Sequence, residues 1–174
     1  MNDPLILVLV AILPSVVVFL TSFYAIKQFM GARQSERVTD LRKEDHKHAL
    51  PLRLQAYERL ALFTERISPG ALVLRLHKSS MSSGSLHSAL ISTIREEFGH
   101  NVTQQIYVSD KAWSKVMKAK EETIRLINLS YEQTGNVNSG TELSRKIFEN
   151  AAKLSHTPSQ EAMQAIKEEV RRMF

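Results

Sequence analysis

The chain has 174 residues, with 23 basic and 18 acidic side chains, a formal net charge of +5 and no cysteine. The lack of cysteine excludes a thiol nucleophile and is typical of proteins in a reducing compartment. No stretch concentrates five or six bases, so the positive charge is spread along the chain.

The first predicted element is an apolar run from Leu5 to Ile26 that contains no charged residue. As a helix, its 22 residues would rise about 33 Å, enough to cross a hydrocarbon core of about 30 Å. The preceding Met-Asn-Asp-Pro carries an acid where a signal peptide carries bases, and the run is longer than the apolar region of a signal peptide. We therefore expect residues 1–26 to form a short exoplasmic stub and a retained transmembrane helix.

Residues 27–49 are expected to continue this helix as a charged juxtamembrane stalk. Six bases lie between Lys27 and Lys47, whereas the stub has none. Because cytoplasmic flanks carry the positive excess, this asymmetry predicts a single-pass protein of the cytoplasmic (inner) membrane, with its N-terminus outside and its C-terminal domain in the cytoplasm. The same excess predicts contacts with anionic lipid through Lys27, Arg33 and Arg37.

Small side chains recur on one face of the apolar run, at steps of four and three residues. They form a candidate transmembrane helix-packing seam of Ala11, Ser15, Val18, Ser22 and Ala25. Small residues let two membrane helices approach closely, so the seam predicts other membrane protein subunits as partners, with a homo-oligomer also open. The alternative is a lone helix whose serines bind their own backbone.

Residues 50–174 show a helical apolar period nearly throughout, with proline and glycine at the joints. Pro51 is expected to interrupt the stalk and to begin a helix through Arg66. A proline-started piece follows from residue 69, then a serine-rich loop at 78–85 and a helix that ends at Gly99. Residues 101–108 fit a strand, a turn or a helix.

The longest predicted helix of this region runs from Asp110 to about Gln133, with Ser109 as its cap. Trp113 opens its apolar stripe, which favours core packing over a partner-binding hot spot. A further helix follows from Thr141, and the last begins at a capping box at 157–160. We therefore predict an all-α protein with one N-terminal transmembrane helix, a charged helical stalk and a cytoplasmic α-helical domain, residues 50–174, of five to six helices.

Two segments of this domain carry a resemblance, residues 50–60 (LPLRLQAYERL) and residues 97–113 (EFGHNVTQQIYVSDKAW). Both resemble an uncharacterised family of single-span, otherwise cytoplasmic membrane proteins of Bacteroidota. The resemblance covers most of the chain after Ala49 and implies a bacterial inner-membrane location. It supplies no catalytic residue, because that family lacks an assigned activity.

Two carboxylate–histidine pairs have the spacing found on di-iron bundle helices, Glu97/His100 and Asp45/His48. Gly99 predicts that the helix of the first pair ends before His100, and the second pair lies on the stalk, so we expect no metal and no cofactor. The sequence also lacks a nucleophile elbow and a glycine-rich phosphate loop. These features predict a protein that is not an enzyme.

The preferred hypothesis is a non-enzymatic, membrane-anchored helical subunit or adapter of a larger inner-membrane complex, whose span packs on partner helices and whose bundle docks partner proteins. The alternative is a membrane tether that binds nucleic acid or a ribosome through basic helix faces. Nearby glutamates dilute both basic clusters, which disfavours the alternative. The candidate contacts are Lys111, Lys115, Lys118, Lys120, Arg171 and Arg172.

Overall fold

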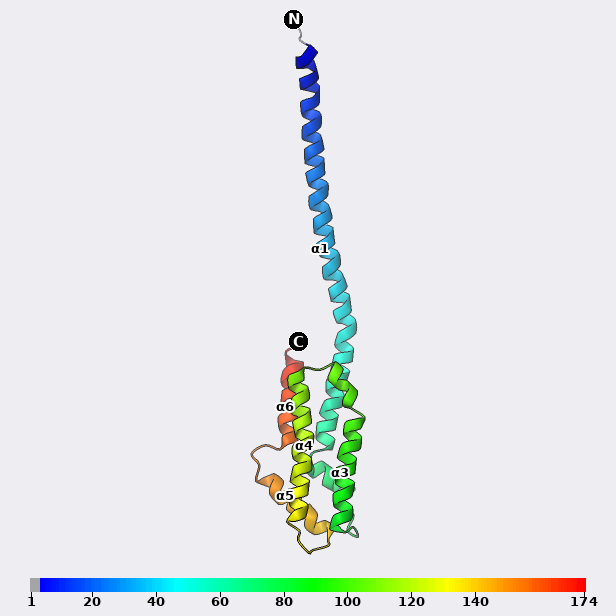
Figure 1. The fold of residues 1–174 in the computed structure, drawn as a ribbon, viewed down its shortest axis with the longest axis vertical. Coiled ribbons are helices and arrows are strands. Elements are labelled where there is room, and N and C mark those ends of the chain that lie inside the picture. The colour runs from blue at the N-terminus through cyan, green and yellow to red at the C-terminus, as the bar shows by residue number, and fades with distance from the viewer. Residues whose placement is uncertain (1–3) are drawn as a thin grey trace. The chain divides into compact units, whose positions relative to one another are not determined.

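A computed structural model describes the backbone of residues 4–174 and the side chains of residue 12 and of residues 14–28 and 49–174. The described residues form six α-helices and one short 3₁₀ helix, and they contain no strand (Figure 1). The predicted all-α class is confirmed for this part of the chain. Two compact units divide the chain, Met1–Ala49 and Leu50–Phe174.

Helix α1 covers Pro4–Arg66 and therefore includes the apolar run, the predicted stalk and the first predicted helix of the second unit. The expected interruption at Pro51 is wrong, because Leu50 and Pro51 are both helical. A residue before proline disfavours the helical region without being excluded from it, and packing of the following turns outweighs that local bias.

The predicted transmembrane helix is wrong. Among the residues that the structure describes, no helix is both long and apolar enough to cross a membrane. The predicted exoplasmic stub, single-pass topology and inner-membrane location all rested on this helix and are corrected with it.

The second unit contains the end of α1 and six further helical segments. Side chains of Ser82, Ser109 and Thr157 each accept a hydrogen bond from a backbone N–H of the first turn that follows, as their positions before helices suggest. The ambiguous stretch 101–108 holds a 3₁₀ helix. The segments are α2 (Pro69–Leu76), α3 (Ser83–Gly99), η1 (Val102–Ile106), α4 (Asp110–Glu132), α5 (Gly140–Ala152) and α6 (Pro158–Arg171).

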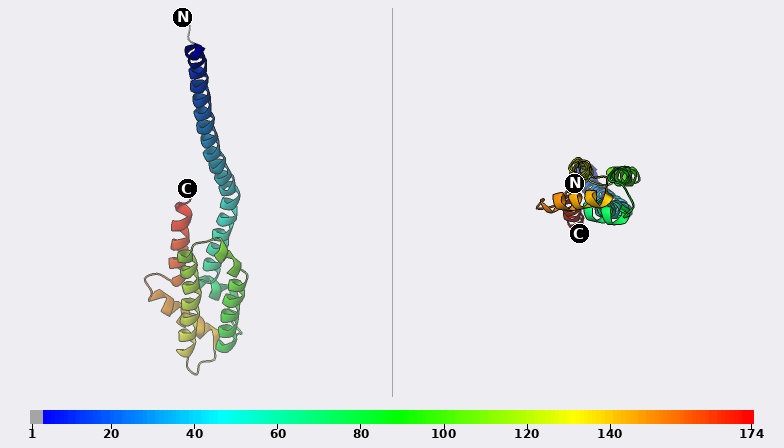
Figure 2. Two further views of the ribbon diagram at one scale, coloured as in Figure 1. Left: turned by 45° about the horizontal axis from the view of Figure 1, so that its top comes forward. Right: turned by 90° about the horizontal axis from the view of Figure 1, so that it is seen from below.

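Helix α4 is the centre of this unit, since it packs against α3, α5 and α6 (Figures 1 and 2). Where α4 and α6 meet the core, both carry small residues, and Ala112, Ala119 and Ala162 are fully buried. Small side chains at a helix contact let the two backbones approach closely. Trp113, at the start of α4, packs on the edge of the core with its ring 5.6 Å from that of Phe98.

The end of α1 enters the same core through large side chains. Tyr57, Leu60 and Phe63 are each at most 1% exposed. Two arginines of α1 also bind backbone carbonyls across the unit, with Arg53 Nε donating to Tyr107 at 3.2 Å and Arg59 donating to His100 at 3.3 Å. The last turns of α1 are therefore an integral part of the second unit.

The start of α5 leaves no space for a side chain at Gly140. Its N–H donates to the carbonyl oxygen of Met81 at 2.9 Å, and an added Cβ would lie 2.8 Å from that oxygen. We expect Gly140→Ala to lower the free energy of unfolding by about 1–3 kcal/mol, because the backbone must shift to relieve the overlap. Urea unfolding of the full chain measures this change.

Gly99→Ala is the matched control, because an added Cβ there meets nothing within 4 Å. Gly99 ends a helix, so alanine is expected to keep or raise the stability. Equal losses from the two substitutions would contradict the close approach assigned to Gly140.

Candidate functional site

A groove of about 510 Å³ lies between α4 and the segment that joins α5 to α6. Ala119, Leu126 and Leu129 line it from α4, at steps of seven and three residues, which place side chains on one helical face. Leu154 and Pro158 complete its apolar surface. Leu129 and Leu154 are 48% and 44% exposed, so the groove presents apolar area that the second unit leaves uncovered.

The rim of the groove carries four Lys or Arg side chains and two carboxylates, a net charge of +2. Both carboxylates form ion pairs within the rim, Glu161 with Lys115 at 3.5 Å and Glu122 with Arg125 at 3.3 Å. The other two bases, Lys118 and Lys153, form no ion pair with a described residue, although Lys153 donates to the side chain of Asn150. The groove therefore combines an apolar floor with unneutralised positive charge.

The predicted basic cluster of α4 does not form one continuous face. Lys111, Lys115 and Lys118 share a face of the helix, whereas the 100° step per residue turns Lys120 to the opposite side. Lys120 pairs with Glu121 at 2.8 Å and lies over the Phe98 ring, 4.4 Å from its centre. At the end of α6, Arg171 lines a different pocket and Arg172 is exposed.

The predicted helix-packing seam is only partly described. Ser15, Val18, Ser22 and Ala25 are exposed within the first unit, and the side chain of Ala11 lies outside the described residues. Among the predicted lipid contacts, Lys27 is exposed, whereas the side chains of Arg33 and Arg37 also lie outside the described residues. Both assignments stay predictions.

The two members of the carboxylate–histidine pair at the end of α3, Glu97 and His100, contact different arginines. Glu97 forms ion pairs with Arg66 at 2.7 Å and with Arg75 at 3.6 Å. His100 follows the last residue of α3, as Gly99 indicated, and its carbonyl accepts from Arg59. Within the described residues, no three His, Cys, Asp or Glu side chains are grouped to hold a metal ion. The side chains of Asp45 and His48 lie outside that part.

A partly buried carboxylate, Glu169, fixes α6, which forms one wall of the groove. Tyr57 donates to Glu169 Oε2 at 2.5 Å, and the hydroxyl of Ser109 donates to Oε1 of the same carboxylate. Burial by itself raises the pKa of Glu169, but the hydrogen bonds from Ser109 and Tyr57 and the charge of Lys111 lower it below the usual value. Burial, followed by the bond to Glu169, raises the pKa of Tyr57.

The sequence did not predict the groove, because its apolar residues come partly from a buried helix face and partly from exposed positions. Leu126 is buried and was readable as part of a core stripe, whereas Leu129 lies beyond that stripe and is exposed. Leu154 comes after the last residue of α5 and reaches the groove only through the turn that follows. An apolar residue beside a buried stripe, together with lysines at three- and four-residue steps, was the available signal.

Comparison with known proteins yields a family but no function. The model of a family of unknown function, DUF7935, matches residues 3–173, which is nearly the whole chain. No curated protein and no solved structure matches the chain.

The Glu169 contact predicts how stability depends on pH. Because the folded pKa of this carboxyl is lowered, its contribution is complete above the usual value near 4.5 and is lost as the pH falls through the folded pKa. Glu169→Gln is expected to lower the free energy of unfolding at pH 7 by about 1.5–3 kcal/mol and to flatten its acid dependence. Denaturant unfolding at a series of pH values measures both effects.

Glu168→Gln is the neighbouring control, since Glu168 is exposed and, among the described side chains, accepts from Gln164 on its own helix. We expect its stability to stay within about 0.5 kcal/mol of the unchanged chain. If the two variants behave alike, the contacts of Tyr57 and Ser109 do not contribute as described.

Proposed function

We propose that this chain, which belongs to the family of unknown function DUF7935, is a non-enzymatic helical adapter that binds an acidic, apolar segment of a partner protein in the groove along α4. The observation that carries the proposal is the exposed pair Leu129 and Leu154 beside Lys118 and Lys153, which form no ion pair with a described residue. We also propose, from the resemblance of residues 50–60 and 97–113, that the chain comes from a member of Bacteroidota.

The chemistry of the groove favours an amphipathic helix or short peptide as the occupant. Such segments place apolar side chains at helical steps into a hydrophobic groove, and flanking charges set their orientation. The two exposed leucines offer the apolar contact, and Lys118 and Lys153 offer positive charge at the rim. Acidic residues beside the apolar ones on the partner would complement this charge and exclude basic competitors.

The same groove argues against nucleic acid as the occupant. Binding of single strands uses aromatic side chains on which bases stack, and no Phe, Tyr or Trp is among the described residues that line the groove. Lys115 and Arg125 are also held by Glu161 and Glu122, which reduces the charge available to a phosphate backbone. An acidic protein segment needs fewer cations and uses the exposed leucines.

The ionisable groups support a binding role over a catalytic one. The partly buried carboxylate whose pKa is displaced, Glu169, is engaged by two hydroxyls that join α1 and α4 to α6. Glu122 and Glu161, the carboxylates of the groove, are each paired with a base of the rim. Each of these carboxylates therefore has a structural partner, as we expect in an adapter.

A photo-crosslinking amino acid placed at Leu129 of the full chain tests the proposal in cells. We expect it to capture a partner protein, with the crosslinked segment apolar and rich in Asp or Glu. The matched control is the same amino acid at Leu74, which is 79% exposed on α2 and does not line the groove. Nucleic acid attached at Leu129, or the same captured proteins from both positions, would contradict the proposal.

Binding of the captured segment, as a purified peptide, then measures the role of the groove. Leu129→Glu and Lys118→Glu are each expected to weaken binding at least tenfold, because one removes apolar contact and the other reverses a rim charge. Leu74→Glu is expected to leave the affinity unchanged. Equal effects of Leu129→Glu and Leu74→Glu would show that the segment binds elsewhere.

A further inference from the structure

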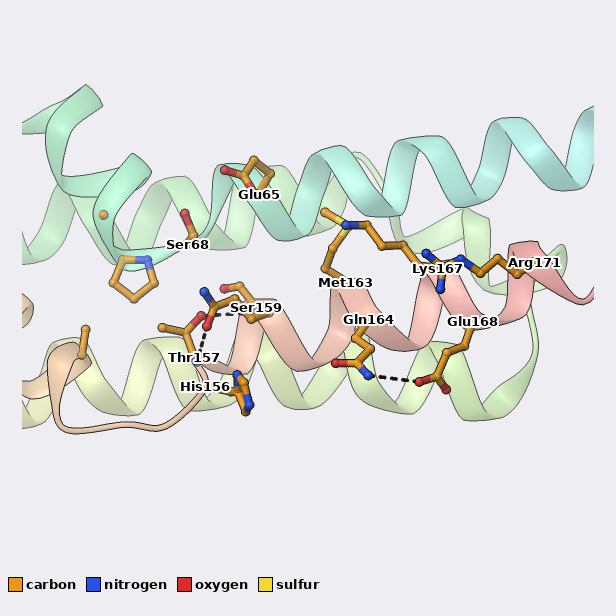
Figure 3. A pocket seen from close by; sticks show the side chains of 14 residues that line it. Glu65, Ser68, His156, Thr157, Ser159, Met163, Gln164, Lys167, Glu168 and Arg171 are labelled. Carbon is orange, nitrogen blue, oxygen red and sulfur yellow. Dashed lines mark hydrogen bonds between the residues drawn. The ribbon is translucent and has the colours of Figure 1, made fainter.

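A second hollow of the described bundle, about 720 Å³ in volume, lies between α6 and the junction of α1 with α2 (Figure 3). Glu65 of α1, the loop residue Ser68, and the first residues of α2 line one side. Residues of α6 from Ser159 to Arg171 line the other. The pocket shares His156 with the groove along α4 but is otherwise formed by different residues.

Two helices begin in this pocket, so backbone N–H groups of their first turns lack partners within the helix. In α2, Ser68 occupies the cap position, yet its hydroxyl makes no capping hydrogen bond. In α6, Thr157 accepts from the N–H of Gln160 at 3.3 Å and so satisfies one group of that turn. The positive ends of two helix dipoles therefore meet at one end of the pocket.

A buried hydroxyl at the same end has no partner. Ser159 is 4% exposed, and its Oγ forms no hydrogen bond within the described structure. Figure 3 shows Ser159 on the side of α6 that faces Ser68 and the start of α2. Buried polar side chains are normally paired, so a single unpaired donor beside two helix starts indicates a group that accepts hydrogen bonds from the pocket.

The charges of the lining residues locate the site. His156, Lys167 and Arg171 are basic, whereas Glu65 and Glu168 are acidic. The carboxylate of Glu168 already accepts from Gln164 at 3.3 Å. Because the positive and negative charges of these side chains nearly cancel, the attraction for an anion is concentrated where α2 and α6 begin. Lys167 is the next basic residue along α6.

We propose that this pocket binds the phosphate group of a small molecule. The Ser159 hydroxyl and the free N–H groups of the first turns of α2 and α6 donate to its oxygens, and the remainder of the molecule extends along α6 toward Lys167. A phosphate suits this arrangement because its oxygens accept hydrogen bonds from several directions, as donors from two helices require. The proposal is independent of partner binding in the groove.

Titration of the full chain with inorganic phosphate tests the site, with chloride at the same ionic strength as the reference. We expect a saturable rise in melting temperature and saturable heat by calorimetry with phosphate only. Ser159→Ala is expected to weaken phosphate binding at least tenfold while leaving the melting temperature without phosphate unchanged or higher, because an unpartnered buried hydroxyl contributes no bond.

Thr123→Val is the matched control, since Thr123 Oγ1 is the other buried unpaired hydroxyl of the described residues and lies on α4 outside the pocket. It should leave phosphate binding unchanged. Lys167→Gln gives a second measurement on an exposed residue and should weaken phosphate binding about threefold. No saturable phosphate response, or an unchanged response in both Ser159→Ala and Lys167→Gln, would overturn the proposal.

Discussion

The close packing of α6 along α4 is the constraint on which the rest of the second unit depends. Fully buried alanines at positions 112, 119 and 162 allow the two helices to approach closely. This approach brings Glu161 to Lys115 on one side and Glu169 to Ser109 at the other end of α6. It also places the first residues of α6 where they line both the groove along α4 and the pocket between α6 and α2. Larger side chains at the alanine positions would separate these elements.

Charged and polar contacts then add to the packing of the apolar core. The end of α1 packs by large apolar side chains, and Tyr57 joins it to α6 through Glu169. Loop 153–157 closes one side of the groove, with His156 at the border of both hollows. The unit therefore presents two different surfaces, an apolar groove with basic rim residues and a polar pocket at two helix starts.

Local sequence predicted the starts of α4 and α6, because Ser109 and Thr157 act through neighbours within three residues. The cap at Ser82 was not predicted, since residues 78–85 were expected to form a serine-rich loop and α3 already begins at Ser83. Predictions that depended on context were weaker. The apolar run from Leu5 satisfied a rule of length and hydropathy, yet no described helix meets the requirement for a membrane span. Pro51 was expected to break a helix that continues through it. Neither the groove nor the pocket was predicted, since Leu154 and Ser68 meet their neighbours only through tertiary packing.

Amide hydrogen exchange of the full chain, with and without the partner segment captured at the groove, tests the central claim most directly. The adapter account predicts slower exchange in residues 115–129 and 150–158, which line the groove, and unchanged exchange in α2. Slower exchange confined to α2 and α3, or the absence of any change along α4, would contradict binding in the groove.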